Sequence, residues 1–173
     1  MNESALMVFL RLIHIIGGVF WVGTVLFLAW FLIPAQRSAG QAGLTVMKEV
    51  MMKRKMSIYL MTAMGLTILS GLVMYAHLAM ATHGAWARTT DAKVLGFGAL
   101  CGIIGGAIGG SSSKKTGMRM AELGNEIQAS GGPPTEAQKA EINALQDKAE
   151  KVMRYVAVLL LLAVAAMASA RYL

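Results

Sequence analysis

The first candidate for chemistry is a histidine in an apolar stretch near the start of the chain. In the run RLIHIIGGVFWVG, His14 is followed by Gly17, Gly18 and Trp21, at i+3, i+4 and i+7. These spacings place all four residues on one face of a helix. The glycines leave a notch beside the imidazole, and the indole closes its far end. A flat aromatic macrocycle could occupy such a notch, and so could a neighbouring helix.

A second histidine lies at the end of another apolar segment. His77 is near the end of the stretch 56–78, whereas His14 is near the start of the stretch 8–33. If both stretches cross a membrane, the two imidazoles lie on the same side at similar depth. A bis-histidine haem needs two imidazoles from facing helices at matched depth. The sequence therefore predicts a haem b site, with His14 as axial iron ligand and His77 as a possible second ligand. Gly17, Gly18 and Trp21 would form its wall.

Other interpretations of these histidines stay open. A histidine near a helix end can hydrogen-bond a neighbouring helix or reach interfacial water. His83, in a loop beside Gly84, is an alternative second ligand, and Met64 and Met74 are others. The four apolar cores contain no Asp, Glu or Lys, and the chain has no HExxH, CxxC, GxSxG or P-loop motif. A catalytic site made from protein side chains alone is therefore hard to assemble from this sequence.

The elements that position these residues are long apolar segments. The chain has 173 residues, of which 56% are hydrophobic and only 14% are charged, whereas a soluble domain is about 25% charged. Four stretches, about 8–33, 56–78, 94–110 and 155–170, are apolar enough to span a bilayer. We predict one domain over residues 1–173, an all-α integral membrane four-helix bundle. Pro34 and Gly40 are expected to end the first helix.

The basic residues predict the topology. The net charge is +7, and twelve of the 16 basic residues fall on one side if the four segments alternate in direction. By the positive-inside rule this side is cytoplasmic, so both termini lie outside. This predicts a multi-pass protein of the bacterial inner (cytoplasmic) membrane with periplasmic termini. We attribute the net positive charge to the topology and to contact with the lipid bilayer, and we expect no nucleic acid partner. The twelve basic residues on the predicted cytoplasmic side are Arg37, Lys48, Lys53, Arg54, Lys55, Lys114, Lys115, Arg119, Lys139, Lys148, Lys151 and Arg154.

Glycines recur every four residues in the third segment. Gly98, Gly102, Gly106 and Gly110 form a small-residue stripe. Such a stripe lets another backbone approach closely, which is how helices associate in lipid. Its partner could be a helix of this chain, a second copy of the chain or a flat cofactor.

A polar arm separates the third and fourth apolar segments. Residues 111–154 contain two stretches with apolar residues at helical spacing, and the run SGGPPTEAQ lies between them. Gly131 or Gly132 can end the first helix. Thr135 can cap the second helix, and Gln138 completes a capping box. We predict that the third and fourth helices extend into the cytoplasm as an antiparallel helical hairpin.

The first segment also resembles that of a group of small bacterial membrane proteins. In LIHIIGGVFWVG, six residues separate Leu-x-His from Trp-x-Gly. This pattern resembles the copper-resistance D-like proteins and the HemJ-type protoporphyrinogen oxidases. The resemblance to the HemJ type implies haem-linked porphyrinogen oxidation with His14 as axial ligand. That type also uses a lysine deeper in the chain, and no intramembrane lysine is present here. The resemblance to the copper-resistance D-like proteins implies copper handling in the outer half of the membrane.

Three functions follow as hypotheses. The first is a haem b-binding membrane protein in electron transfer or porphyrin-related redox chemistry, and whether it is an enzyme stays open. The second is a structural or assembly subunit, joined to a larger membrane complex or to a homo-oligomer through the glycine stripe or the arm. The third is copper handling, because His14, His77, His83 and nearby methionines offer imidazole and thioether groups to Cu(I).

Overall fold

The computed structural model describes residues 3–173, without the side chain of Gln41, and these residues form helices joined by short turns. Four helical segments are long and apolar enough to cross a membrane, which confirms the predicted number and the all-α class. The elements in chain order are α1 (Glu3–Phe27), η1 (Leu28–Leu32), α2 (Ile33–Ser38), α3 (Gly40–Lys48), η2 (Glu49–Lys53), α4 (Met56–Ala81), η3 (Trp86–Arg88), α5 (Thr90–Ser130), α6 (Glu136–Ser169) and η4 (Ala170–Tyr172).

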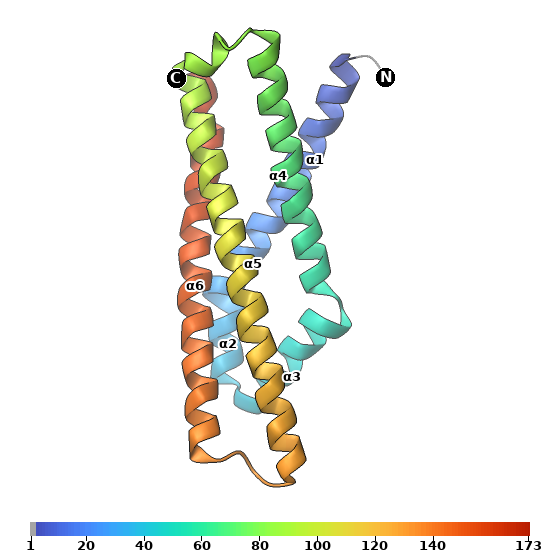
Figure 1. Cartoon of the computed structure of the whole chain (residues 1–173), viewed down its shortest axis with the longest axis vertical. Coiled ribbons are helices and arrows are strands. Elements are labelled where there is room, and N and C mark those ends of the chain that lie inside the picture. The colour runs from blue at the N-terminus through green and yellow to red at the C-terminus, as the bar shows by residue number, and fades with distance from the viewer. Residues whose placement is uncertain (1–2) are drawn as a thin grey trace.

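The helices are arranged as two antiparallel pairs. Figure 1 shows α5 and α6 side by side over their whole length, while α4 packs beside the outer part of α1. The α1 helix crosses the bundle obliquely, so its second half lies against α6. The start of α1 and the end of η4 lie at one end of the molecule, and the turn between α5 and α6 lies at the other. We call the end with the start of α1 and the end of η4 the terminal end.

The prediction that Pro34 ends the first helix is wrong. The helix continues through Pro34 and ends at Ser38. A π-helical turn, η1, comes immediately before the proline, and the N–H of Ile33 donates to the carbonyl of Leu28, five residues earlier. Proline lacks an N–H and its ring clashes with the carbonyl four residues earlier in a regular helix. The wider π turn makes room for that ring. The chain reverses only at Gly40, whose φ is +55°.

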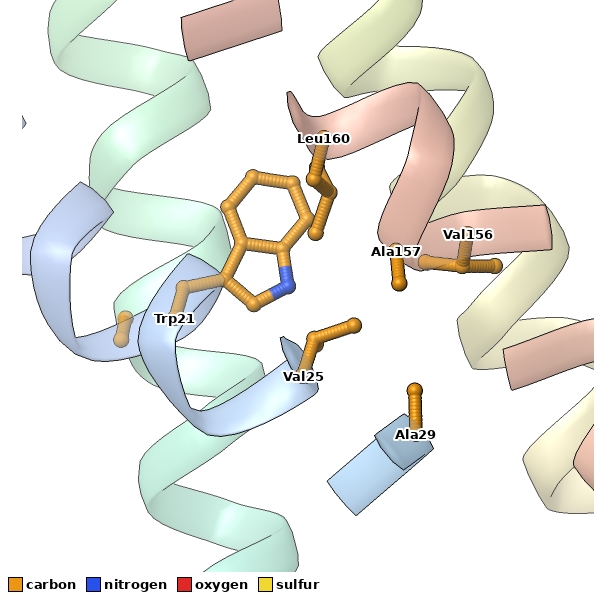
Figure 2. Close-up of a cluster of buried hydrophobic side chains, with 7 residues drawn as sticks. Trp21, Val25, Ala29, Val156, Ala157 and Leu160 are labelled. Carbon is orange, nitrogen blue, oxygen red and sulfur yellow. The ribbon is translucent and has the colours of Figure 1, made fainter. Parts of the chain in front are cut away.

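The core of the bundle lies where α1 crosses α6. Trp21 and Val25 are 5% and 3% exposed, and they pack against Ala157 and Leu160 (Figure 2). Ala29 in η1 is fully buried at the same contact, and its small side chain lets the two helices approach. Trp21 therefore fills the core between helices of this chain. It does not close a notch beside His14.

The glycine stripe of α5 faces two helices of the same chain. A Cβ atom added at Gly98 would stand 3.1 Å from the carbonyl oxygen of Ala163 in α6. A Cβ added at Gly106 would stand 3.0 Å from Sδ of Met64 in α4. Both distances are shorter than ordinary van der Waals contact. Intramolecular packing, one of the three alternatives for this stripe, is therefore observed at these two positions.

The other two glycines of the stripe, Gly102 and Gly110, do not show the same close approach to a neighbouring helix. Cβ atoms added at Gly102 and Gly110 would meet nothing within 4 Å among the described residues. Gly102 is nevertheless buried. A role for these two positions in close helix packing stays a prediction.

The hairpin arm forms as the sequence predicts. Gly131 ends α5 with a φ of +64°. Thr135 caps α6 through a complete capping box, in which the backbone N–H of Gln138 donates to Thr135 Oγ1 at 3.2 Å. The backbone N–H of Thr135 donates in return to Gln138 Oε1 at 2.9 Å. Local capping chemistry therefore places the turn of the arm.

An arginine joins the two helices of the arm. Arg119 in α5 forms a two-point ion pair with Glu141 in α6, through Nε to Oε1 at 2.6 Å and Nη2 to Oε2 at 3.0 Å. It also reaches Glu122 and Glu126 of its own helix, each at 3.2 Å. The hydrogen bonds from Arg119 lower the pKa of the Glu141 carboxyl and, in turn, raise the pKa of the guanidinium.

This ion pair predicts a pH dependence of the arm, which lies outside the apolar segments. Because the pKa of Glu141 is lowered in the folded arm, its stabilising effect is present above the unfolded pKa of about 4.3 and is lost as the pH falls through the lowered value. NMR titration of the labelled carboxyl should show this shift. In Arg119→Gln the Glu141 pKa should return to the ordinary range, whereas Lys115→Gln should leave it lowered. An ordinary Glu141 pKa in the wild-type protein would contradict the ion pair.

Candidate functional site

His14 is anchored to the neighbouring helix through one ring nitrogen. Its Nδ1 lies 2.7 Å from the backbone carbonyl oxygen of Thr67 in α4. A carbonyl oxygen can only accept, so the proton is on Nδ1, and Nε2 carries the free lone pair of the neutral ring. The Ser70 hydroxyl donates mainly to the carbonyl of Leu66 at 2.6 Å and lies 3.2 Å from the carbonyl oxygen of Thr67. The first role of His14 is therefore to fix α1 against α4.

The notch predicted beside His14 is filled by α4. A Cβ added at Gly17 would stand only 2.6 Å from Thr67 Oγ1, and one added at Gly18 would stand 3.6 Å from Thr67 Cγ2. On the opposite side of the contact, a Cβ added at Gly71 would stand 2.7 Å from Cε1 of His14. These glycines let two helices of this chain meet closely. The notch has no room for a macrocycle, so a haem does not fit there.

His77 lies at a different level of the bundle. Its Nε2 is 3.1 Å from Glu3 Oε1, near the start of α1. His14 lies opposite Gly71, and His77 is six residues further along α4, which is about 9 Å at 1.5 Å per residue. The two imidazoles therefore do not face each other across one site. A haem with both of them as axial ligands does not fit this arrangement.

The third histidine is not part of this region. His83 is exposed in the turn after α4 and has a positive φ of 50°. It is absent from the lining of the groove described next.

A groove separates α1 and α4 at the terminal end. Its volume is about 330 Å³, and we call it the α1–α4 groove. It is lined by Met7, Val8, Arg11, Met74, His77 and Leu78. Sequence reasoning singled out His77 and Met74 but missed Met7 and Arg11. One signal was available, because Met7 precedes His14 by seven residues and therefore shares its helix face.

Three groups in the groove can bind a soft metal ion. Met7 and Met74 supply thioethers and His77 supplies an imidazole. Thioether ligands select Cu(I), and imidazole also suits copper. No group of three His, Cys, Asp or Glu residues that could hold a metal ion occurs among the described residues. The donor set of the groove is thus suited to a soft ion and not to a hard one.

The two charged groups at the groove affect its chemistry in opposite ways. Nε2 of His77 lies 3.1 Å from Oε1 of the Glu3 carboxylate, so Nδ1 is the ring nitrogen that this contact does not involve. A carboxylate partner of this kind orients a ligating histidine and raises its basicity. The Arg11 side chain brings a positive charge, which opposes the binding of a cation. Because helical side chains tilt toward the N-terminus, we expect its head group to be directed toward the terminal end.

Comparisons of the chain with family models, curated proteins and solved structures found no match.

Proposed function

We propose that this protein binds Cu(I) reversibly in the α1–α4 groove and serves copper handling at the outer face of a bacterial inner membrane. The observation that carries the proposal is the presence of two thioethers and one imidazole in one groove, contributed by Met7, Met74 and His77. A site of three soft or borderline neutral ligands suits a monovalent soft ion. The proposed role is to take up or hand over the ion, with no bond of a substrate made or broken.

The proposed orientation places the groove outside the cytoplasm. Four apolar helices indicate a multi-pass membrane protein. The residues that line the groove belong to the first part of α1 and the last part of α4, at the terminal end. The arm lies at the opposite end, and most of the basic residues belong to that side by the order of the segments. The positive-inside rule supports a cytoplasmic arm and periplasmic termini. In this orientation the groove opens where the outer leaflet meets the periplasm.

The other two hypotheses stay predictions. Haem b binding through His14 has one supporting feature, the free lone pair on Nε2 with Nδ1–H held by a backbone carbonyl. The filled notch and the displaced His77 count against it, and no step is derived through haem. The subunit hypothesis loses part of its basis, because Gly98 and Gly106 already pack within the chain. Its remaining basis is the arm.

The test is a Cu(I) competition titration of the protein purified in detergent under reducing conditions. Bicinchoninate serves as the competing chelator, and the expected result is one Cu(I) per chain. Removing the positive charge in Arg11→Gln should tighten binding several-fold, because a cation near the bound ion is lost. No competition with the chelator would overturn the proposal, and so would weaker Cu(I) binding in Arg11→Gln. A visible spectrum of the same sample tests haem, because a Soret band that weakens in His14→Ala would favour that hypothesis.

A further inference from the structure

A second hollow lies at the other end of the membrane-spanning part, between α2 and α6. Its volume is about 150 Å³, and we call it the α2–α6 hollow. It is lined by Arg37, Asp147, Glu150, Lys151 and Arg154. Arg37 follows the apolar part of the first spanning segment, and Arg154 immediately precedes the apolar part of α6. The hollow is therefore at the depth of lipid head groups, on the side that carries the arm.

The charges in this hollow leave an excess of one positive charge. Arg37 forms ion pairs with Asp147 at 2.6 Å and with Glu150 at 2.9 Å. Arg154 pairs with Glu150 at 2.6 Å. The ammonium group of Lys151 has no ion pair among the described residues. The two carboxylates thus pair with the two guanidinium groups, and Lys151, which has no ion pair among the described residues, lines the same hollow.

An exposed apolar stripe continues from this hollow along α6. Tyr155, Val158 and Leu162 follow Lys151 at i+4, i+7 and i+11, so all four residues share one helix face. These three side chains are 71%, 50% and 45% exposed. The stripe runs from the cationic hollow toward the middle of the apolar part of α6. A cationic group above an exposed apolar stripe matches a phospholipid, which has an anionic head and acyl chains.

We propose that the α2–α6 hollow binds the phosphate of an anionic phospholipid, with acyl chains along the stripe of Tyr155, Val158 and Leu162. Lys151 supplies the main contact, and unused N–H groups of Arg37 and Arg154 add donors. Basic pockets between spanning helices on the cytoplasmic side bind anionic head groups in this way. Such a lipid would bridge α2 and α6, which the Arg37 ion pairs also join. The proposal does not depend on copper binding.

Lipid binding is measured by native mass spectrometry of the whole protein in detergent with added phosphatidylglycerol or phosphatidylcholine. The wild-type protein should retain phosphatidylglycerol in preference to phosphatidylcholine. Lys151→Gln should weaken retention about fivefold, the contribution of one basic residue near a membrane surface. Lys151→Arg should preserve it. Lys139→Gln is the matched control, because this lysine is on the same helix near the turn of the arm and pairs only with Glu136 among the described residues.

Three results would overturn the proposal. Equal retention of the two lipids would show that the negative charge of the lipid is not recognised. Equal losses in Lys151→Gln and Lys139→Gln would show general attraction to a basic surface. Displacement of the lipid by millimolar inorganic phosphate would identify a site for a free anion. Because Lys151 has no ion-pair partner to lose among the described residues, its substitution should leave the helical circular dichroism unchanged, and this is checked for every variant.

Discussion

Replacing both groove methionines, in Met7→Leu/Met74→Leu, should lower the affinity for Cu(I) by about a hundredfold or more. Each substitution removes one of the three neutral donors that line the α1–α4 groove. Loss of a group that merely hydrogen-bonds a metal ligand costs about ten- to a hundredfold in metal affinity, so a lost direct ligand should cost at least as much. Leucine and methionine have similar volumes, and such exchanges cost less than about 1.5 kcal/mol of stability. The loss should therefore appear in metal binding and not in folding.

The control for this variant is Met61→Leu. Met61 is on α4 as well, is 54% exposed and does not line the groove. Its Cu(I) affinity should equal that of the wild-type protein. His77→Leu should lose affinity like a methionine variant, because it removes the imidazole. If the double methionine variant binds Cu(I) as tightly as the wild-type protein, the ion is bound elsewhere and the groove is not the site.

Replacing Gly71 by alanine should destabilise the contact between α1 and α4 by about 1–3 kcal/mol, the usual cost of overpacking a well-packed interior. The added Cβ would stand 2.7 Å from Cε1 and 2.9 Å from Nδ1 of the His14 ring. The ring must move, and its hydrogen bond to the carbonyl of Thr67 is lost as it does so. The free energy of unfolding can be measured by circular dichroism during denaturation of the detergent-solubilised protein with sodium dodecyl sulfate.

Gly65→Ala is the matched control for this substitution. Gly65 is on the same helix, and a Cβ there would meet nothing within 4 Å among the described residues. Alanine should be neutral or stabilise the helix by up to about 1 kcal/mol at that position. Adding His14→Ala to Gly71→Ala should recover part of the loss, because the clashing ring is gone. Equal stabilities of Gly71→Ala and Gly65→Ala would mean that His14 is not pressed against Gly71.

Much of the fold follows from the sequence by itself. The four apolar stretches predict the four long helices, because only a helix satisfies its backbone polar groups across the apolar layer. Thr135 and Gln138 predict the start of α6, since a capping box is a local interaction of four residues. The pair Gly131 and Gly132 predicts the end of α5, because glycine readily adopts the left-handed conformation, and in the structure Gly131 does so. These features depend on residues close in the chain.

The tertiary structure determines which residues of neighbouring helices lie opposite each other. The depth estimate from helix ends put His14 and His77 at one level, but the register of α1 on α4 is set by Gly17, Thr67 and Gly71, which bring His14 against Gly71. The same register places Met7, Met74 and His77 along one groove. Helical periodicity shows which residues share a face, and it carries no information on how far one helix slides along another. That sliding is fixed by the fit of side chains between helices, which exists only once they pack.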